Sequence, residues 1–276
     1  MKLIVTNHNR DTFNSRYVYP VVSRRAGGLS LGINLNTNNK CNWQCIYCEI
    51  PNLKRGKPES IDLNRLRNEL KDWLNNIVKG DFIDKHTNPG TKFKDIALSG
   101  NGEPTACKEF KSVLGIIEKE FADSQFPKDV KIRLITNGSY LSKREIQEAW
   151  QEMPLAKEIW FKIDSVNTET IKQLNQVNLT HNQIKKNLES ALSISSTVIQ
   201  TCLTKINGQL PKESEVSDYV NFLKPYEKKI TSIHLYSLAR PTEQKTLYNL
   251  GRLNDQEMIR IAEKMNELSI PIFTFS

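Results

Sequence analysis

The segment Cys41-Asn-Trp-Gln-Cys45-Ile-Tyr-Cys48-Glu-Ile-Pro51 places three cysteines within eight residues. Only Cys107 and Cys202 occur elsewhere in the 276-residue chain, so this spacing is unlikely to arise by chance. The chain opens without a charged and apolar leader pattern, and we therefore expect a cytoplasmic protein. Thiols stay reduced in that compartment, where grouped cysteines bind metals more often than they form disulfides. The segment thus predicts a set of metal ligands.

Three thiolates suit an iron–sulfur cluster that keeps one iron open, because a saturated cluster takes four cysteines. A structural zinc site would need a fourth ligand in a paired spacing of cysteines and histidines. The four histidines lie far from the segment in sequence, at His8, His86, His181 and His234. A ferredoxin run carries four cysteines with other spacings. Cluster binding is the prediction, with zinc and inert buried thiols as alternatives.

Composition limits the class of protein only loosely. A length of 276 residues with 38% hydrophobic content allows one large core, and we expect a single domain over 1–276. Within it we expect a core at 28–240, an N-terminal extension at 1–27 and a C-terminal helix and strand at 241–276. No apolar run approaches the roughly 18 residues that cross a bilayer, so no membrane association is expected. The net charge of +8 favours an anionic partner.

Short apolar or β-branched runs alternate with stretches of helical spacing. The runs lie at 31–35, 95–98, 131–136, 158–164, 197–204 and 232–238. One of the intervening helices is expected to open at Ser142-Lys-Arg-Glu145, which has the capping-box pattern. Alternating strands and helices predict a parallel sheet with helices outside it. Six such units fit an α/β fold of the partial (βα)6 TIM-like barrel type, with a doubly wound open sheet as the runner-up.

Unusual residues follow each of these runs. The cysteine segment follows the first run, Ser99-Gly-Asn-Gly-Glu-Pro-Thr105 the second and Thr136-Asn-Gly138 the third. Lys162 and Asp164 end the fourth, Gln200 lies in the fifth and Tyr236 in the sixth. In an α/β barrel the C-terminal ends of the strands meet at one face, which carries the active site. The sequence therefore predicts an active site at the C-terminal strand ends.

The cysteine segment resembles the hallmark of the radical S-adenosylmethionine (SAM) superfamily, a C-x3-C-x2-C loop with an aromatic residue before the last cysteine. Tyr47 fills that aromatic position. The resemblance implies a [4Fe–4S] cluster on Cys41, Cys45 and Cys48, whose open iron binds the amino and carboxylate groups of SAM. It also implies reductive cleavage of SAM to methionine and a 5′-deoxyadenosyl radical that abstracts hydrogen from a substrate. Such a reaction requires a reductant such as flavodoxin or ferredoxin.

The segment Gly100-Asn-Gly-Glu-Pro104 resembles the glycine- and glutamate-containing motif that contacts SAM in this superfamily. A strand-to-helix turn would use the same residues, and both interpretations can hold together. Lys162 and Asp164 share one face of a strand, so they are expected either to contact SAM or to form a mutual ion pair. The expected SAM-binding residues are Tyr47, Gly100, Asn101, Gly102, Glu103, Asn137, Lys162, Asp164, Gln200 and Tyr236. Cys202 is expected to be a small core residue.

Basic residues flank the expected active face and are candidates for binding an anionic group of the substrate. They are Arg24, Arg25, Lys54, Arg55, Lys57 and Arg240. The alternative interpretation is an ordinary solvated surface. Arginine is suited to the candidate role because its guanidinium binds phosphate or carboxylate with two parallel hydrogen bonds.

Residues 18–240 resemble a radical SAM subgroup that includes the wyosine-forming tRNA enzymes, most clearly at 23–48 and 99–105. Those enzymes use further cysteines for a second cluster, and this chain has no cysteine before Cys41. We expect RNA as the substrate, with a peptide or protein as the first alternative and a small metabolite as the second. The alternative of another class is a metal-stabilised RNA-binding module without catalysis.

Overall fold

The computed structural model describes residues 2–4, 13–122 and 129–276, so part of the expected N-terminal extension lies outside the described residues. One sheet of eight strands organises these residues, in the order β1-β2-β5-β6-β7-β8-β10-β12. The strands are β1 (Val18–Ser23), β2 (Gly28–Ile33), β5 (Phe93–Leu98), β6 (Lys131–Thr136), β7 (Lys157–Lys162), β8 (Thr197–Leu203), β10 (Ile230–Ser237) and β12 (Ile272–Phe275). Neighbours are parallel throughout, except that β1 runs antiparallel to β2.

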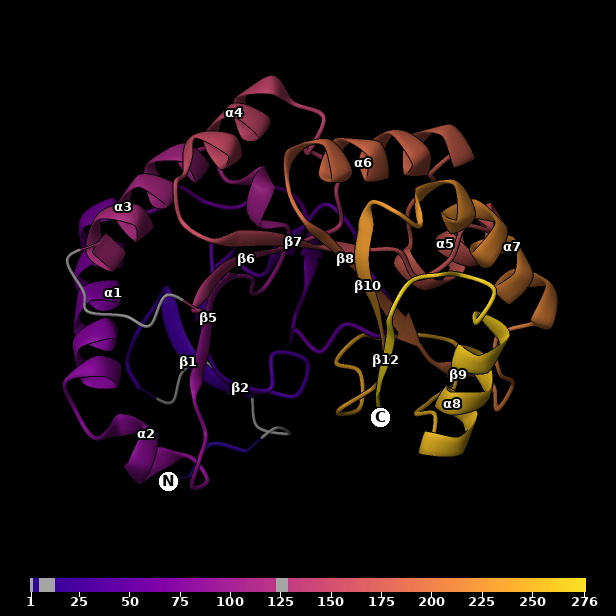
Figure 1. Ribbon diagram of the computed structural model, residues 1–276, viewed down its shortest axis with the longest axis horizontal. Helices are drawn as coiled ribbons and strands as arrows, with labels where there is room; N and C mark the ends of the chain where they lie inside the picture. The colour runs from indigo at the N-terminus through magenta and orange to yellow at the C-terminus, as the bar shows by residue number, and fades with distance from the viewer. Residues whose placement is uncertain (1, 5–12, 123–128) are drawn as a thin grey trace.

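The sheet curls into an incomplete barrel, and the helices lie outside it (Figure 1). Its strands occur in the order in which they occur in the chain, whereas a doubly wound sheet reverses that order at a switch point. The runner-up fold is therefore excluded and the partial TIM-like barrel is confirmed. The barrel is open because, among the described residues, the edge strands β1 and β12 pair on one side only.

The helices follow the strands as the periodicity predicts. They are α1 (Leu63–Val78), α2 (Phe82–His86), α3 (Phe110–Ala122), α4 (Arg144–Glu152), α5 (Thr168–Asn175), α6 (His181–Ile194), α7 (Glu213–Leu223) and α8 (Asp255–Lys264). Short 3-10 turns occur at Pro104–Ala106 and Lys224–Tyr226. None of the described helices is long and apolar enough to cross a membrane.

Caps at the helix starts show how local sequence sets these boundaries. The side chain of Asp62 accepts the N–H of Arg65 at 3.0 Å and begins α1. The expected capping box at 142–145 does not form, because α4 begins at Arg144 and its N-cap, Lys143, makes no side-chain capping bond. The N-cap therefore lies one residue later than expected.

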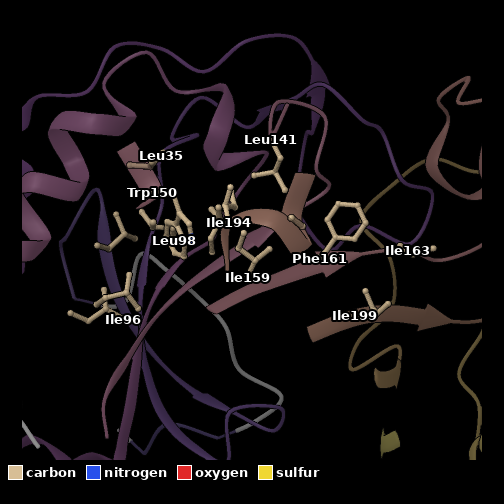
Figure 2. Close-up of a cluster of buried hydrophobic side chains, with 14 of the residues drawn as sticks. Leu35, Ile96, Leu98, Leu141, Trp150, Ile159, Phe161, Ile163, Ile194 and Ile199 are labelled. Carbon is tan, nitrogen blue, oxygen red and sulfur yellow. The ribbon is translucent and has the colours of Figure 1, made fainter. Parts of the chain in front are cut away.

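Alternation along the strands separates two faces of the sheet. Residues such as Ile96, Leu98, Ile159, Phe161 and Ile199 face the helices and belong to the main hydrophobic core. Figure 2 shows part of this layer. Their neighbours along the strands face the barrel interior, because successive side chains of a strand point to opposite faces. The residues of the interior face are polar to an unusual degree, and they position the candidate site.

Two short ribbons lie beside the main sheet at the barrel mouth. β3 (Lys40–Cys41) pairs with β4 (Lys54–Arg55), and β9 (Lys205–Ile206) pairs with β11 (Leu250–Gly251). The first ribbon holds the two ends of the cysteine segment together. The second ribbon joins the residues that follow β8 to the end of the loop that follows β10.

Candidate active site

A cavity of about 340 Å³ lies inside the incomplete barrel and reaches the C-terminal ends of the strands. Its wall includes Cys45, Tyr47 and Cys48 from the cysteine segment together with Gly100 and Gly102 from the loop after β5. Lys162, Cys202 and Tyr236 contribute from β7, β8 and β10. Motifs that are far apart in sequence therefore meet at one cavity, as the strand order predicts.

The cysteine segment is fastened from both sides. Lys40 pairs with Lys54 and Cys41 with Arg55, which closes the segment into a loop. Opposite this ribbon, Asn137 at the end of β6 donates from Nδ2 to Asn42 Oδ1 at 2.9 Å. Asn137 therefore lies beside the cysteine segment and binds the protein there, and it does not belong to the wall of the interior cavity.

The loop between β10 and β11 holds the other side of the cysteine segment. Thr242 Oγ1 donates to the carbonyl oxygens of Ile46 and Cys48, at 2.7 and 3.1 Å. Gln244 Nε2 donates to the carbonyls of Cys48 and Ile50, at 3.1 and 2.7 Å. We call residues 240–250 the anchoring loop. Sequence reasoning missed it, because nothing in its own pattern indicates which backbone it binds.

The three thiols have the environment of cluster ligands. Cys41 Sγ accepts the N–H of Trp43 at 3.4 Å, and Cys45 Sγ accepts an N–H of Asn175 at 3.3 Å. Burial raises the pKa of Cys41 to about 12, and Cys45 and Cys48 add to the shift. Hydrogen bonds to cluster sulfurs are one of the means by which proteins tune such centres.

Among the described ranges, no three His, Cys, Asp or Glu side chains surround a single metal position. A four-iron cluster takes one thiolate per iron, so its ligands surround a larger body than a single metal ion.

Asn101 has a feature that suits a cofactor with N–H groups. Its Oδ1 is buried and has no hydrogen-bond partner within the described residues. The donor set and this unpartnered acceptor fit a [4Fe–4S] cluster and SAM.

Asp164 joins four segments at the top of the barrel. Its Oδ1 accepts the N–H of Cys202 at 2.9 Å and lies 3.1 Å from Lys162 Nζ. Its Oδ2 accepts from Asn175 Nδ2 at 2.7 Å and from the Tyr47 hydroxyl. Both carboxylate oxygens are thus engaged by the protein, and of the two expectations for this pair the ion pair is present.

Lys162 is buried among aromatic rings. Its Nζ donates to the Tyr236 hydroxyl at 2.7 Å and lies 4.8 Å from the ring centroid of Tyr47. Burial lowers the pKa of Lys162, but the charge of Asp164 and the hydroxyl of Tyr236 outweigh it and hold the pKa well above its ordinary value. The ammonium therefore carries a fixed positive charge beside the cysteine segment.

The loop after β5 places its backbone close to the cysteine segment. Gly100 has φ +145°, and a Cβ there would lie 2.4 Å from Asn34 Oδ1. A Cβ on Gly102 would lie 2.4 Å from the carbonyl oxygen of Lys40. Both positions therefore require glycine, because any side chain would overlap a neighbouring segment.

Glu103 connects this loop to the end of β6. Its Oε1 accepts from the Thr105 N–H at 3.1 Å and from Thr136 Oγ1 at 2.6 Å, and its Oε2 accepts the N–H of Asn137 at 2.7 Å. Burial raises the pKa of Glu103, and the donors of Thr105 and Thr136 offset part of that effect. The carboxylate holds two loops in place, whatever contact it makes with a cofactor.

The floor of the cavity carries a charged network that sequence reasoning missed. Arg133 on β6 pairs with Asp95 on β5 and, at 2.8 Å from its Nε, with Glu158 on β7. Trp160 Nε1 donates to Glu158 at 2.8 Å, and Ser30 donates to Asp95. The alternation of charged and apolar residues in β6 and β7 was the available signal, since it marks a polar inner face.

The six basic candidates separate into two groups. Arg24, Arg25 and Arg240 line the interior cavity. Lys54 lines a different hollow beside Gln244 and Leu247, and Arg55 donates to the carbonyl oxygen of Asn42 at 3.2 Å. Lys57 is exposed in the loop after β4, and its carbonyl oxygen accepts from Asn38 Nδ2 at 3.2 Å. The structure therefore does not bring the six residues together.

A parallel, incomplete barrel with three neighbouring thiols above a polar cavity has the architecture of an enzyme that holds a cluster and a second ligand at the C-terminal strand ends. Residues 35–223 match the radical SAM superfamily, and the chain belongs to that superfamily. It is therefore a radical SAM enzyme that uses a [4Fe–4S] cluster and SAM. The interpretation as a non-catalytic binding module is set aside.

Curated relatives show similarity over most of the chain. A UPF0026 protein of Helicobacter pylori (strain J99) is 28% identical over 256 residues, which cover 87% of this chain and 70% of that protein. GTPase Obg of Brachyspira hyodysenteriae is 28% identical over 266 residues, which cover 93% of this chain but only 34% of that protein. These relatives do not include the wyosine-forming enzymes that the motifs resemble.

Solved structures share the fold. A radical SAM methyltransferase from Sphaerobacter thermophilus aligns with a TM-score of 0.63 at 12% identity, over 94% of this chain and 69% of that chain. Streptococcus suis SuiB bound to the precursor peptide SuiA aligns with a TM-score of 0.57 at 14% identity, over 91% of this chain. The present chain spans about half of SuiB, 49% of its length. At these identities the likeness establishes the fold alone.

Proposed function

We propose that Cys41, Cys45 and Cys48 hold the [4Fe–4S] cluster and that the cavity beneath them holds SAM and the reacting group of a substrate. When bound, the cluster supplies the electron that cleaves SAM reductively to the 5′-deoxyadenosyl radical, which abstracts hydrogen from the substrate. The single observation that supports this most is the meeting of Cys45, Cys48, Gly100, Gly102 and Lys162 at one cavity.

Within the cavity the expected SAM-binding residues take two roles in this proposal. Tyr47, Gly100, Gly102, Lys162 and Tyr236 line the cavity and contact the cofactor directly. Asn101 lines a second hollow, with Asn34 and Arg240, and its unpartnered Oδ1 is available there to an N–H group. The other four candidates act through the protein, because their polar groups already bind neighbouring segments: Glu103, Asn137, Asp164 and Gln200.

The protein's own part in the reaction is to hold the cofactors and to exclude competing reactions. The fixed ammonium of Lys162 offers an opposite charge to an anionic group of the cofactor. Side chains of β7, β8 and β10 form part of the cavity wall. A reductant such as flavodoxin or ferredoxin completes the proposal.

The test is anaerobic reconstitution followed by assay of 5′-deoxyadenosine. We expect about four irons per chain and release of 5′-deoxyadenosine from SAM after reduction with dithionite. Cys41→Ala, Cys45→Ala and Cys48→Ala should each abolish both results. Cys107→Ala is the matched control, because Cys107 is buried in the main core away from the cavity. Stoichiometric zinc without a reducible cluster would refute the proposal.

RNA is the proposed substrate. The net charge of +8 and the basic residues Lys54 and Lys57 after the cysteine segment support it. The finer likeness to the wyosine-forming subgroup rests on the motifs at 23–48 and 99–105 alone. A peptide is the alternative, and a comparison of modified nucleosides and of the proteome in a deletion strain would distinguish the two.

A further inference from the structure

The turn between β1 and β2 carries two arginines to the cavity wall. Ala26 donates its N–H to Ser23 Oγ at 3.1 Å, and Gly27 donates its N–H to the Ser23 carbonyl at 3.0 Å. Gly27 has φ +70°, the left-handed conformation that closes such a turn. The backbone that carries Arg24 and Arg25 is therefore held in a defined conformation before any ligand binds.

Five cationic side chains line the cavity, and three of them have carboxylate partners. The paired ones are Arg133 with Asp95, Lys162 with Asp164 and Arg240 with Glu49. Within the part of the chain that the structure describes, Arg24 and Arg25 form no ion pair with an Asp or Glu side chain. Arg24 instead donates to the carbonyl oxygens of Ser237 and Ser276. That leaves Arg25 as the cation with the fewest acceptors.

Arg25 has only neutral neighbours that hold its guanidinium in place. Its Nη1 donates to Gln200 Oε1, and its other N–H groups have no acceptor among the described residues. The guanidinium lies 4.4 Å from the ring centroid of Tyr236 and 5.7 Å from that of Trp160. A guanidinium has five N–H donors in a planar fork, so most of its capacity is available to a ligand.

The position of Arg25 differs from that of Lys162. Lys162 on β7 pairs in register with Gln200 on β8, the residue to which Arg25 donates. Both cations lie beside the ring of Tyr236, at 4.4 Å from its centroid for Arg25 and 5.3 Å for Lys162. Their other contacts differ, because Arg25 lies beside the Trp160 ring, whereas the Lys162 ammonium reaches Asp164 and Tyr47 beside the cysteines.

The surroundings of Arg25 are electropositive. Burial lowers the pKa of Arg24, and the charges of Arg252 and Arg25 lower it further. His234, which is bonded to Gln200, stays neutral because burial lowers its pKa to about 4, with Arg25 and Arg133 adding to the effect. A site that disfavours additional positive charge in this way favours an anion.

We propose that Arg25 is an oxyanion-binding subsite that receives a carboxylate or phosphate of the substrate inside the barrel. The inference rests on the proposed function and deepens it, because it names the group that the substrate presents. Gln200 and Tyr236 orient the guanidinium, and its free N–H groups bind the two oxygens of the anion. The exposed residues Lys54 and Lys57 take no part in this subsite.

The test uses the reconstituted enzyme with two probes, inorganic phosphate followed by ³¹P NMR and ¹³C-labelled acetate followed by ¹³C NMR. The wild type should broaden at least one probe signal in a saturable manner. Arg25→Gln should weaken that binding about tenfold or more, because a charge-assisted hydrogen bond is lost. Arg25→Lys should retain part of it. Arg144→Gln is the matched control, because this arginine is exposed on α4 and pairs with Glu148, and it should bind as the wild type does.

The two probes distinguish the source of the oxyanion. Tighter phosphate binding assigns the subsite to a phosphorylated substrate group, and tighter acetate binding assigns it to a carboxylate. Circular dichroism and iron content should be unchanged in Arg25→Gln. That result would show that the variant folds and binds its cluster. If it does not fold, Arg25→Lys and Gln200→Leu, which leaves the guanidinium unoriented, should still lower affinity.

Two results would overturn the inference. Equal probe binding by the wild type and Arg25→Gln would show that the anion binds elsewhere. A tenfold or larger rise in the SAM dissociation constant of Arg25→Gln, with SAM displacing the probe, would assign Arg25 to the cofactor instead. Failure of the proposed function itself would appear differently, as absent 5′-deoxyadenosine in the wild type.

Discussion

At the scale of single residues, Gln200 connects the charged Arg25 to the neutral ring of His234. Because Arg25 donates to Oε1, the amide nitrogen of Gln200 must face His234, where Nε2 lies 3.0 Å from Nδ1. That geometry requires Nδ1 to accept, which a protonated imidazole cannot do. The ring is also 5.3 Å from that of Trp160. His234 is therefore held neutral by its hydrogen bond as well as by burial.

This arrangement predicts a pH dependence of folding. The pKa of His234 falls from 6.5 to about 4 on folding, first through burial and then through Arg25 and Arg133. Between these values the unfolded chain binds more protons, so stability is present above pH 6.5 and is lost as the pH falls toward 4. The resulting decrease in the free energy of unfolding should reach about 3 kcal/mol. His234→Gln should remove this component in urea unfolding, whereas the exposed His181→Gln should not. Identical pH profiles for the wild type and His234→Gln would contradict the assignment.

Asp164 leads to a second prediction at this scale. Asp164→Asn leaves the Lys162 ammonium buried without its opposite charge, and we expect a loss of about 3 kcal/mol in the free energy of unfolding. Glu148→Gln, which removes an exposed pair with Arg144, should cost less than about 1 kcal/mol. Denaturant unfolding of both variants compares them directly. A similar small cost for both would show that the Asp164 pair contributes little.

At the scale of elements, the anchoring loop is the feature with the clearest consequence. Its side chains bind the backbone carbonyls on either side of Cys48, while Glu243 donates its N–H to the Cys48 carbonyl at 3.1 Å. A loop that lies nearly 200 residues later in the chain therefore determines the conformation of the cysteine segment. Its function depends on β10 ending beside β8 and on the β9–β11 ribbon that holds its far end.

The double variant Thr242→Ala/Gln244→Ala tests this loop. It removes four side-chain hydrogen bonds to the cysteine segment. We expect the free energy of unfolding to fall by about 2 to 4 kcal/mol. We also expect incomplete or slower loading of the cluster. Iron content after reconstitution and thermal unfolding are the measurements. Leu247→Ser is the control from the same loop, because Leu247 is fully exposed. Normal loading in the double variant would mean that the ribbon of β3 and β4 holds the segment without help.

At the scale of the whole molecule, the incomplete barrel separates an interior with charged groups from an exterior with basic loops. The RNA proposal concerns the exterior, where Lys54 and Lys57 follow the cysteine segment. Arg55 lies between them but binds the carbonyls of Asn42 and Gln176, so its replacement would disturb the segment itself. A test of RNA binding should therefore leave Arg55 unchanged.

Lys54→Glu/Lys57→Glu should reduce affinity for single-stranded RNA without changing iron content or 5′-deoxyadenosine release. In the wild type, binding should weaken by roughly 0.7 log units per log unit of salt for each phosphate neutralised. Filter binding or fluorescence anisotropy over a salt series measures both effects. Binding that is insensitive to salt, or equal in the variant and the wild type, would favour a peptide substrate.

The sequence by itself determined the features that depend on local spacing. The three cysteines, the alternation of strands and helices and the occurrence of motifs after successive strands could all be predicted, because each depends on residues close together in the chain. The parallel barrel then follows from connection rules. The expected capping box at Ser142 failed because the pattern is short and occurs at turns without forming its bonds.

Only the tertiary structure decided which polar groups are partners. Arg25 and Gln200 are 175 residues apart, and Thr242 binds a carbonyl 196 residues earlier. Strand spacing predicts that a side chain faces inward, but not which group on another strand it meets. The basic residues that look alike in sequence therefore divide into Arg25 inside the barrel and Lys54 outside it. The physical reason is that hydrogen bonds and ion pairs act over a few ångströms in space, whatever the distance along the chain.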